Sequence, residues 1–135
     1  MFKKTTPLTL FTSAMLLIAC SSGSTESGVD FSSLASDPSD CDGKVIKTTG
    51  WHVDAFETSA LGEAAGQRGG ATYLTEPSIW INRAAVRAEA ECFIAETIPH
   101  ARFCRMEVEG RFEYGETYGH LGAYKYQITH AAEQR

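Results

Sequence analysis

The sequence predicts a mainly β fold, a small five-stranded Greek-key barrel with one α-helix between its third and fourth strands. Three observations lead to this prediction. Residues 104–114 alternate strictly between uncharged and charged residues, glycines interrupt two strand-like segments, and only one segment has a helical period. Alternation with a period of two is typical of a strand with one buried face, and glycine inside a strand marks a bulge or a sharp bend.

The first three strands are predicted at 44–56, 71–76 and 78–82. The first is rich in β-branched and aromatic residues and contains Gly50, whereas Pro77 separates the second from the third. Segment 58–70 contains four glycines and is predicted to be a loop.

One α-helix is predicted over Asn82–Ile98. Asn82 suits an N-cap, alanines favour the helix, and Pro99 would end it. Four apolar residues then fall on one face at helical spacing: Val86, Ala90, Phe93 and Ile94.

The last two strands are predicted at 103–114 and 123–131, joined by the glycine-rich turn 115–122. The inward-facing residues of the first would be Cys104, Met106, Val108, Gly110, Phe112 and Tyr114. Three strands, a helix and two strands is the element order of the OB-fold, a partly open five-stranded barrel.

The N-terminus has the layout of a secretory signal. Lys3 and Lys4 precede an apolar stretch at 8–19, which is shorter than the roughly 20 residues that a membrane-spanning helix needs. The end of this stretch and the residue that follows it, Leu17-Ile18-Ala19-Cys20, resemble the lipobox of bacterial lipoproteins. This resemblance implies removal of residues 1–19, attachment of acyl chains such as palmitate to Cys20 and, because Ser21 follows, sorting to the outer membrane.

The chain is therefore predicted to have three parts: a signal at 1–19, a lipidated Cys20 with a flexible Ser/Gly-rich tether to residue 40, and one domain at 41–135. The full chain has 12 basic and 17 acidic residues. Without Lys3 and Lys4, 10 basic residues remain, which gives a net charge near −7. Such a charge argues against nucleic acid as a partner, because phosphate neutralisation supplies most of that affinity.

Three cysteines would remain after lipidation of Cys20. An oxidising compartment favours a disulfide, and we predict Cys92–Cys104 because the helix would lead directly into the strand that carries Cys104. The rival pairing is Cys41–Cys92. The odd count leaves one thiol free or paired with another molecule.

The domain resembles a group of uncharacterised bacterial exported proteins with an OB-like domain. The similar segments are 44–53, 79–82, 105–113 and 119–131, read as "KVIKTTGWHV", "IWIN", "RMEVEGRFE" and "GHLGAYKYQITHA". Thr48 departs from the group, which has an apolar residue there. The resemblance supports the fold and implies no activity.

Residues that could carry chemistry are few. The four histidines lack metal-ligand spacing, and no nucleophile motif occurs, so the sequence predicts no catalytic residues, no metal and no cofactor. OB-folds bind ligands through aromatic platforms and through the loop between their last two strands. Trp51 and His120 are accordingly the candidate ligand-binding residues, although core packing for Trp51 and a turn-stabilising role for His120 remain the alternatives.

These observations predict a non-enzymatic lipoprotein, anchored in the outer membrane by its N-terminal lipid and facing the periplasm, that binds an envelope protein or glycan. The first alternative is a structural or assembly module of an envelope complex. The second is a small metal-binding protein or hydrolase.

Overall fold

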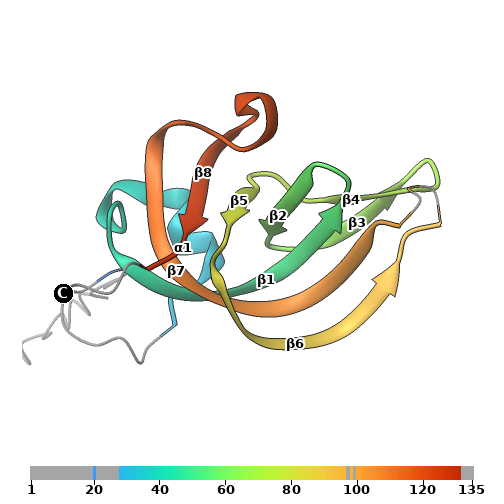
Figure 1. The fold of residues 1–135 in the computed structure, drawn as a ribbon, viewed down its shortest axis with the longest axis horizontal. Coiled ribbons are helices and arrows are strands. Elements are labelled where there is room, and N and C mark those ends of the chain that lie inside the picture. Colours follow the sequence, from blue (N-terminus) through green and yellow to red (C-terminus); the bar gives the residue numbers. More distant parts are fainter. Residues whose placement is uncertain (1–19, 21–27, 97, 99, 132–135) are drawn as a thin grey trace, which may run out of the picture.

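The computed structural model describes residues 20, 28–96, 98 and 100–131, and over these residues the protein is mainly β (Figure 1). The elements are α1 (Phe31–Ser36), η1 (Pro38–Asp40), β1 (Val45–Ala55), β2 (Thr58–Gly62), β3 (Ala65–Arg68), β4 (Ala71–Leu74), β5 (Ile79–Asn82), β6 (Ala85–Ile94), β7 (Arg102–Tyr118), η2 (His120–Gly122) and β8 (Tyr124–Thr129).

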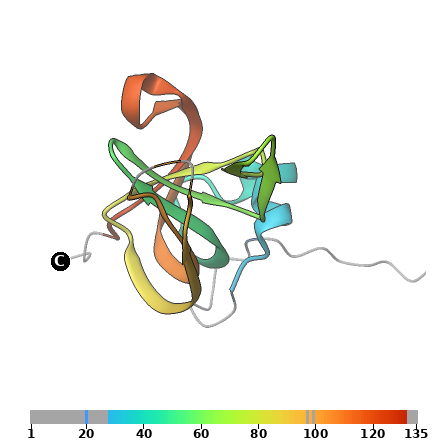
Figure 2. The ribbon, with the colours of Figure 1, turned by 90° about the vertical axis from the view of Figure 1, so that its right-hand side faces the viewer.

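Six strands form one sheet in the order β1-β2-β5-β8-β7-β6, and β1 also pairs with β7. The pairing of β5 with β8 is parallel, whereas the other pairings in this sheet are antiparallel. β3 and β4 form a separate two-stranded sheet. β1, β7 and β6 lie side by side as curved ribbons (Figure 1), and Figure 2 shows from the β3–β4 end how strongly the sheet is curved.

Alternation along β7 builds the larger of two cores. Cys104, Met106, Val108 and Phe112 are buried on one face of β7, as the sequence predicts, whereas Tyr114 is 40% exposed. The same core contains Ile46, Leu61 and Ile128 from β1, β2 and β8. Phe103 points to the other face of β7, where it joins a smaller core with Val53, Ala60, Ala95 and Ala101.

The α-helix predicted over Asn82–Ile98 is wrong. Asn82 ends β5, Arg83 adopts a left-handed φ of 60°, and the chain continues as β6 along the edge of β7. Pairing with β7 decides the conformation: Arg87 binds Glu109 and Cys92 is bonded to Cys104 across the two strands. These cross-strand contacts, which helical spacing does not reveal, outweigh the helix propensity of alanine.

The predicted loop at 58–70 is also wrong in part, because it contains β2 and β3. Glu57, with a φ of 55°, lies in the tight turn that reverses the chain after β1, and Ala60 and Leu61 of β2 are buried. In both β2 and β3 a glycine leaves room for a side chain of β4. A Cβ at Gly62 would lie 3.0 Å from that of Leu74, and one at Gly66 would lie 2.8 Å from the Tyr73 hydroxyl.

A flexible tether was predicted over 20–40, and residues 28–40 of this segment pack against the β domain. Val29 donates its backbone N–H to the Lys47 carbonyl at 2.6 Å, and Phe31 and Leu34 of α1 are buried in the larger core. Phe31 and Leu34 are three residues apart, so they lie on one face of this short helix and can be buried together. The predicted signal at 1–19 lies outside the described residues.

Within the described part of the chain, no helix is both long enough and apolar enough to cross a membrane.

Candidate functional site

A pocket of about 360 Å³ opens at the end of the molecule where β1 finishes. Buried residues of the smaller core, Val53, Ala60 and Phe103, form part of its lining. The β1–β2 turn contributes Phe56 and β4 contributes Tyr73. The remaining lining residues are Ala55, Thr58, Thr72, Leu74, Glu76, Ser78, Ile98 and Tyr124. A pocket of this volume is in the range that binds small ligands.

Large apolar side chains stand exposed at the mouth of the pocket. Phe56 is 88% exposed, Tyr73 is 40% exposed and Ile98 is 39% exposed. Hydroxyl groups of Thr58, Thr72 and Ser78 accompany them. An apolar pocket with a few polar groups is typical of a binding site, because the apolar surface gives affinity and the polar groups fix orientation.

The loop between β7 and β8 lies beside this end of the molecule. His120 Nε2 in this loop is 3.3 Å from Glu57 Oε2 in the β1–β2 turn. Gly119 allows the loop to approach the sheet closely, since it has a φ of 73° and a Cβ there would lie 2.6 Å from the Trp80 ring. Leu121, the next residue after His120, is 91% exposed.

The structure does not bring the two predicted ligand-binding residues together in the pocket. Trp51 lies in the middle of β1, half-buried against the smaller core, with its ring centroid 5.7 Å from that of Phe93. His120 lies in the loop near the pocket, and neither residue is among those that line it. Their predicted role in binding stays a prediction.

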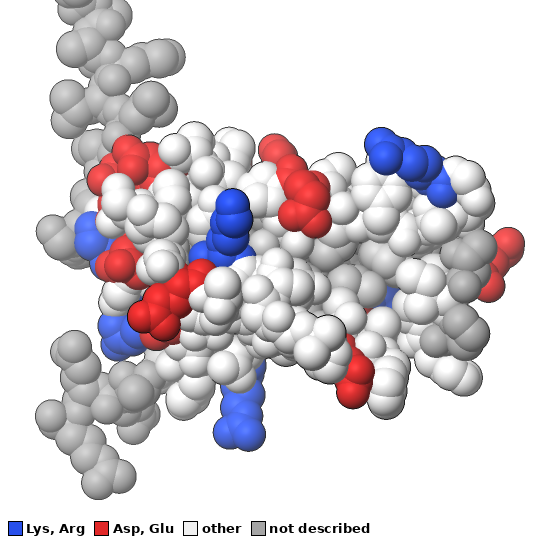
Figure 3. Space-filling view, turned by 90° about the horizontal axis from the view of Figure 1, so that it is seen from above, with Lys and Arg blue, Asp and Glu red and all other residues white. Residues whose placement is uncertain are grey.

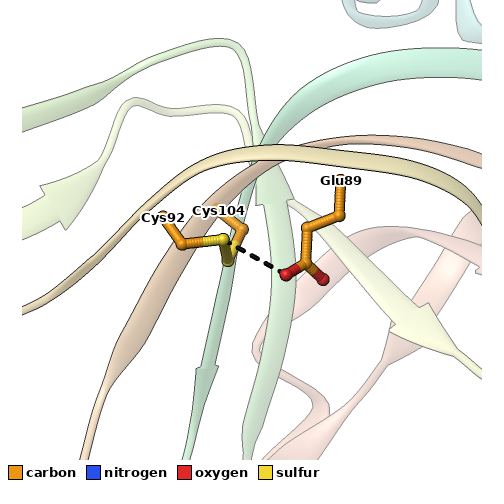
Figure 4. Close-up of side chains that lie close together, drawn as sticks. All are labelled: Glu89, Cys92 and Cys104. Atoms are coloured by element: carbon orange, nitrogen blue, oxygen red, sulfur yellow. Dashed lines mark hydrogen bonds between the residues drawn. A yellow bond between two sulfur atoms is a disulfide. The ribbon is translucent and has the colours of Figure 1, made fainter.

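Cys92 and Cys104 form a disulfide between β6 and β7, the pairing that the sequence predicts (Figure 4). Glu89 Oε1 lies 3.2 Å from Cys92 Sγ and also binds the guanidinium of Arg102. The three potential ligands Glu89, Cys92 and Cys104 are close together, but a disulfide sulfur offers no thiolate to a metal ion. The cluster is therefore a cross-strand link and not a metal centre in this oxidised form.

A second disulfide joins Cys20 to Cys41, so none of the four cysteines is free in the structure. Lys44 Nζ donates a hydrogen bond to the Cys20 carbonyl at 2.8 Å. The lipidation predicted for Cys20 would use the same sulfur atom as this disulfide. The two modifications are chemically exclusive in one molecule, and lipidated molecules would keep Cys41 as a buried thiol.

His52 is a half-buried histidine of the sheet. Its Nε2 lies 2.9 Å from Ser59 Oγ on the neighbouring strand, β2. Burial lowers the pKa of His52 below 6.5; the negative charges of Asp54 and Glu89 oppose this shift, and the positive charge of Arg102 adds to it. The folded protein therefore holds this imidazole neutral more readily than the unfolded chain does.

We expect the free energy of unfolding to fall as the pH is lowered through the region below 6.5. In that range the unfolded chain binds a proton at residue 52 before the folded protein does, which favours unfolding. Urea unfolding at a series of pH values should show a weaker pH dependence for His52→Gln than for the wild type. Identical slopes for the two proteins would contradict this assignment.

Charged side chains are mixed on the face seen in Figure 3. Some basic and acidic residues lie next to one another and others are scattered among uncharged residues, and no continuous basic strip crosses this face. A basic strip is the electrostatic signature of a surface that binds nucleic acid.

Sequence reasoning missed the pocket, because its lining is assembled from five strands, β1, β2, β4, β7 and β8, and from the segments that connect strands, and β2 was not predicted. The sequence contained one indication of the pocket, which is the large apolar residue Phe56 next to Glu57. The chain reverses at Glu57 in the structure. Comparison with known proteins found no matching family model, no similar curated protein and no similar solved structure.

Proposed function

We propose that this protein is a lipoprotein of the outer membrane, held by acyl chains on Cys20, whose β domain is a non-enzymatic binding module facing the periplasm. The proposed anchor is supported by the lipobox-like residues 17–20. Val29 is hydrogen-bonded to Lys47 near the start of β1, whereas the pocket lies at the other end of β1. The 11 residues of β1 would therefore separate the pocket from the anchored end by roughly 30 Å.

We further propose that the curved sheet is an OB-like barrel. Support comes from the pairings, which run from β1 through β2, β5, β8 and β7 and return to β1. The parallel pairing of β5 with β8 fits this topology. In an OB-fold the loops after the first strand and between the last two strands border the ligand site. The corresponding segments here are the β1–β2 turn and the loop with His120.

The ligand class that fits best is an oligosaccharide of the envelope. OB-folds bind oligonucleotides and oligosaccharides, and 17 acidic against 12 basic residues disfavour the former. The observation that carries the proposal is the pocket, in which aromatic rings of Phe56, Tyr73 and Tyr124 stand beside hydroxyl groups. Flat rings can pack against the C–H faces of sugars while hydroxyl groups exchange hydrogen bonds with them.

Co-sedimentation with purified peptidoglycan tests this function. We expect the protein to sediment with the insoluble glycan, and Phe56→Ala combined with Tyr73→Ala to weaken binding by about 30-fold, because two stacking surfaces of about 1 kcal/mol each are lost. Leu121→Ala is the matched control, since Leu121 is an exposed apolar residue at the same end and does not line the pocket. Retention that is absent in the wild type, or unchanged in the double variant, would overturn the glycan proposal.

The second candidate function is binding of a protein partner, as a structural or assembly module of an envelope complex. It is favoured by Phe56 and Leu121, which expose 88% and 91% of their area from two neighbouring loops. Exposed apolar side chains that gather in one place are typical of protein interaction sites. The same assay separates the two candidates, because a wild-type protein that does not sediment with purified peptidoglycan would remove the glycan proposal and leave this one.

A further inference from the structure

The pocket has an unbalanced charge. Glu76 is the one lining residue that is charged at neutral pH, and no lysine, arginine or histidine is among the residues that line it. Among the described residues, none forms an ion pair with Glu76. Its Oε2 instead accepts the backbone N–H of Ser78 at 3.1 Å, which leaves the carboxylate with its negative charge uncompensated.

The same charge acts on a second residue of the pocket. The pKa of Tyr124 is raised, first by burial of its hydroxyl and then by the negative charge of Glu76. Tyr124 and Glu76 come from different parts of the chain, the start of β8 and the segment before β5, and both line the pocket. The carboxylate and the phenol therefore border one common space.

Aromatic rings surround that space. Phe56, Tyr73, Phe103 and Tyr124 all line the pocket. The faces of such rings attract cations, and several rings together recognise ammonium groups in other proteins. One of these rings already holds a cation of the same chain, because the guanidinium carbon of Arg68 lies 5.6 Å from the centre of the Tyr73 ring.

We propose that the pocket takes an alkylammonium group, with Glu76 as its counter-charge and the rings around it. The inference deepens the proposed function, on which it rests, by naming the group of the ligand that is recognised. Two sources in the envelope share this chemistry: an amino group on a sugar or its attached peptide, and a lysine side chain of a protein. An uncharged sugar lacks the group.

Calorimetric titration of the detergent-solubilised protein with three probes tests the inference. The probes are a glucosamine tetramer with free amino groups, the same tetramer with acetylated amino groups, and Nα-acetyl-lysine methylamide, all at about pH 5.5, where the amino groups of the sugar and of lysine are protonated. We expect an amine probe to bind about tenfold more tightly than the acetylated tetramer, the value of one charge-assisted hydrogen bond.

Glu76→Gln keeps the size of the side chain and should remove this preference. Glu63→Gln is the matched control, because Glu63 is an exposed carboxylate that does not line the pocket. A thermal melt of each variant confirms that it is folded. A preference that survives in Glu76→Gln, or that is lost equally in Glu63→Gln, would contradict the role of Glu76.

The outcomes separate this inference from the glycan proposal. Equal binding of the two tetramers would overturn the inference and leave glycan binding in place. Binding of the lysine probe alone would support the inference for an amino group on a peptide rather than on a sugar, and the peptidoglycan assay then separates the peptide attached to the glycan from a protein partner. Failure of both amine probes to bind would overturn the inference, whatever the peptidoglycan assay shows.

Discussion

Gly110→Ala should destabilise the protein by about 3 kcal/mol or more, and lower its Tm by more than about 10 °C. A Cβ at this position of β7 would lie 2.3 Å from the Thr129 carbonyl oxygen and 2.7 Å from Ile128 Cγ2. The link between β5 and β6 leaves no room on another side, since Ala84 Cβ would be 3.3 Å away. Because three paired segments meet here, none of them can move without losing hydrogen bonds. Thermal melting followed by circular dichroism measures the effect.

Gly28→Ala is the matched control. Its Cβ would meet the Lys47 carbonyl oxygen at 3.4 Å, which is close to an ordinary contact, so a change within about 0.5 kcal/mol is expected. A general cost of placing alanine where the chain has glycine would appear in both variants. A wild-type Tm for Gly110→Ala would show that β8 does not approach β7 in this way.

Cys20→Ser should move the protein completely from the membrane fraction to the soluble fraction. The thioether that would carry the acyl chains cannot form on serine, and stable anchoring takes two or more acyl chains. Fractionation of cells followed by intact-mass analysis measures both the location and the attached lipid. Full membrane retention of Cys20→Ser would contradict the anchor.

Cys41→Ser separates the anchor from the Cys20–Cys41 disulfide. If Cys20 carries lipid, this variant stays in the membrane and loses only the stability that a serine hydroxyl costs at the buried position 41, because no disulfide is lost. If the disulfide forms instead, wild-type protein is soluble and Cys41→Ser loses stability of about 3 kcal/mol, the effect of opening a loop of this length. Lipidation of Cys20 and its disulfide with Cys41 exclude each other, and the two cases predict different locations and stabilities for Cys41→Ser.

A strand that buries one of its faces was predictable from the sequence. The alternation of 103–114 places Cys104 and Phe112 correctly in the core, and the glycine at 110 marks a real close approach. Cys92–Cys104 was also predicted, although from a helix that does not exist: the two residues face each other across adjacent strands. The prediction was right because both conformations bring these cysteines close together.

The errors have a common physical cause, which is that pairing between distant strands outweighs local preference. Alanines at 85, 88 and 90 favour a helix, yet every residue of β6 is exposed and the strand is held through its partner β7. The pocket could not be predicted for a similar reason. Phe56 and Glu76 lie in connections between strands and Tyr73 lies in β4, outside the six-stranded sheet, so the positions of all three depend on how the chain is assembled.

The pairing of β1 with β7 also determines how the chain must fold. Val45 lies opposite Arg111, so 66 residues must be made and brought round before this pair can form. Contacts so distant along the chain cost loop entropy before they give any stabilisation, and proteins dominated by them fold in milliseconds to seconds rather than microseconds. The hairpin of β6 and β7 is local and can form early. Closure of β7 onto β1 is then the slow step, and until it occurs neither core can be completed.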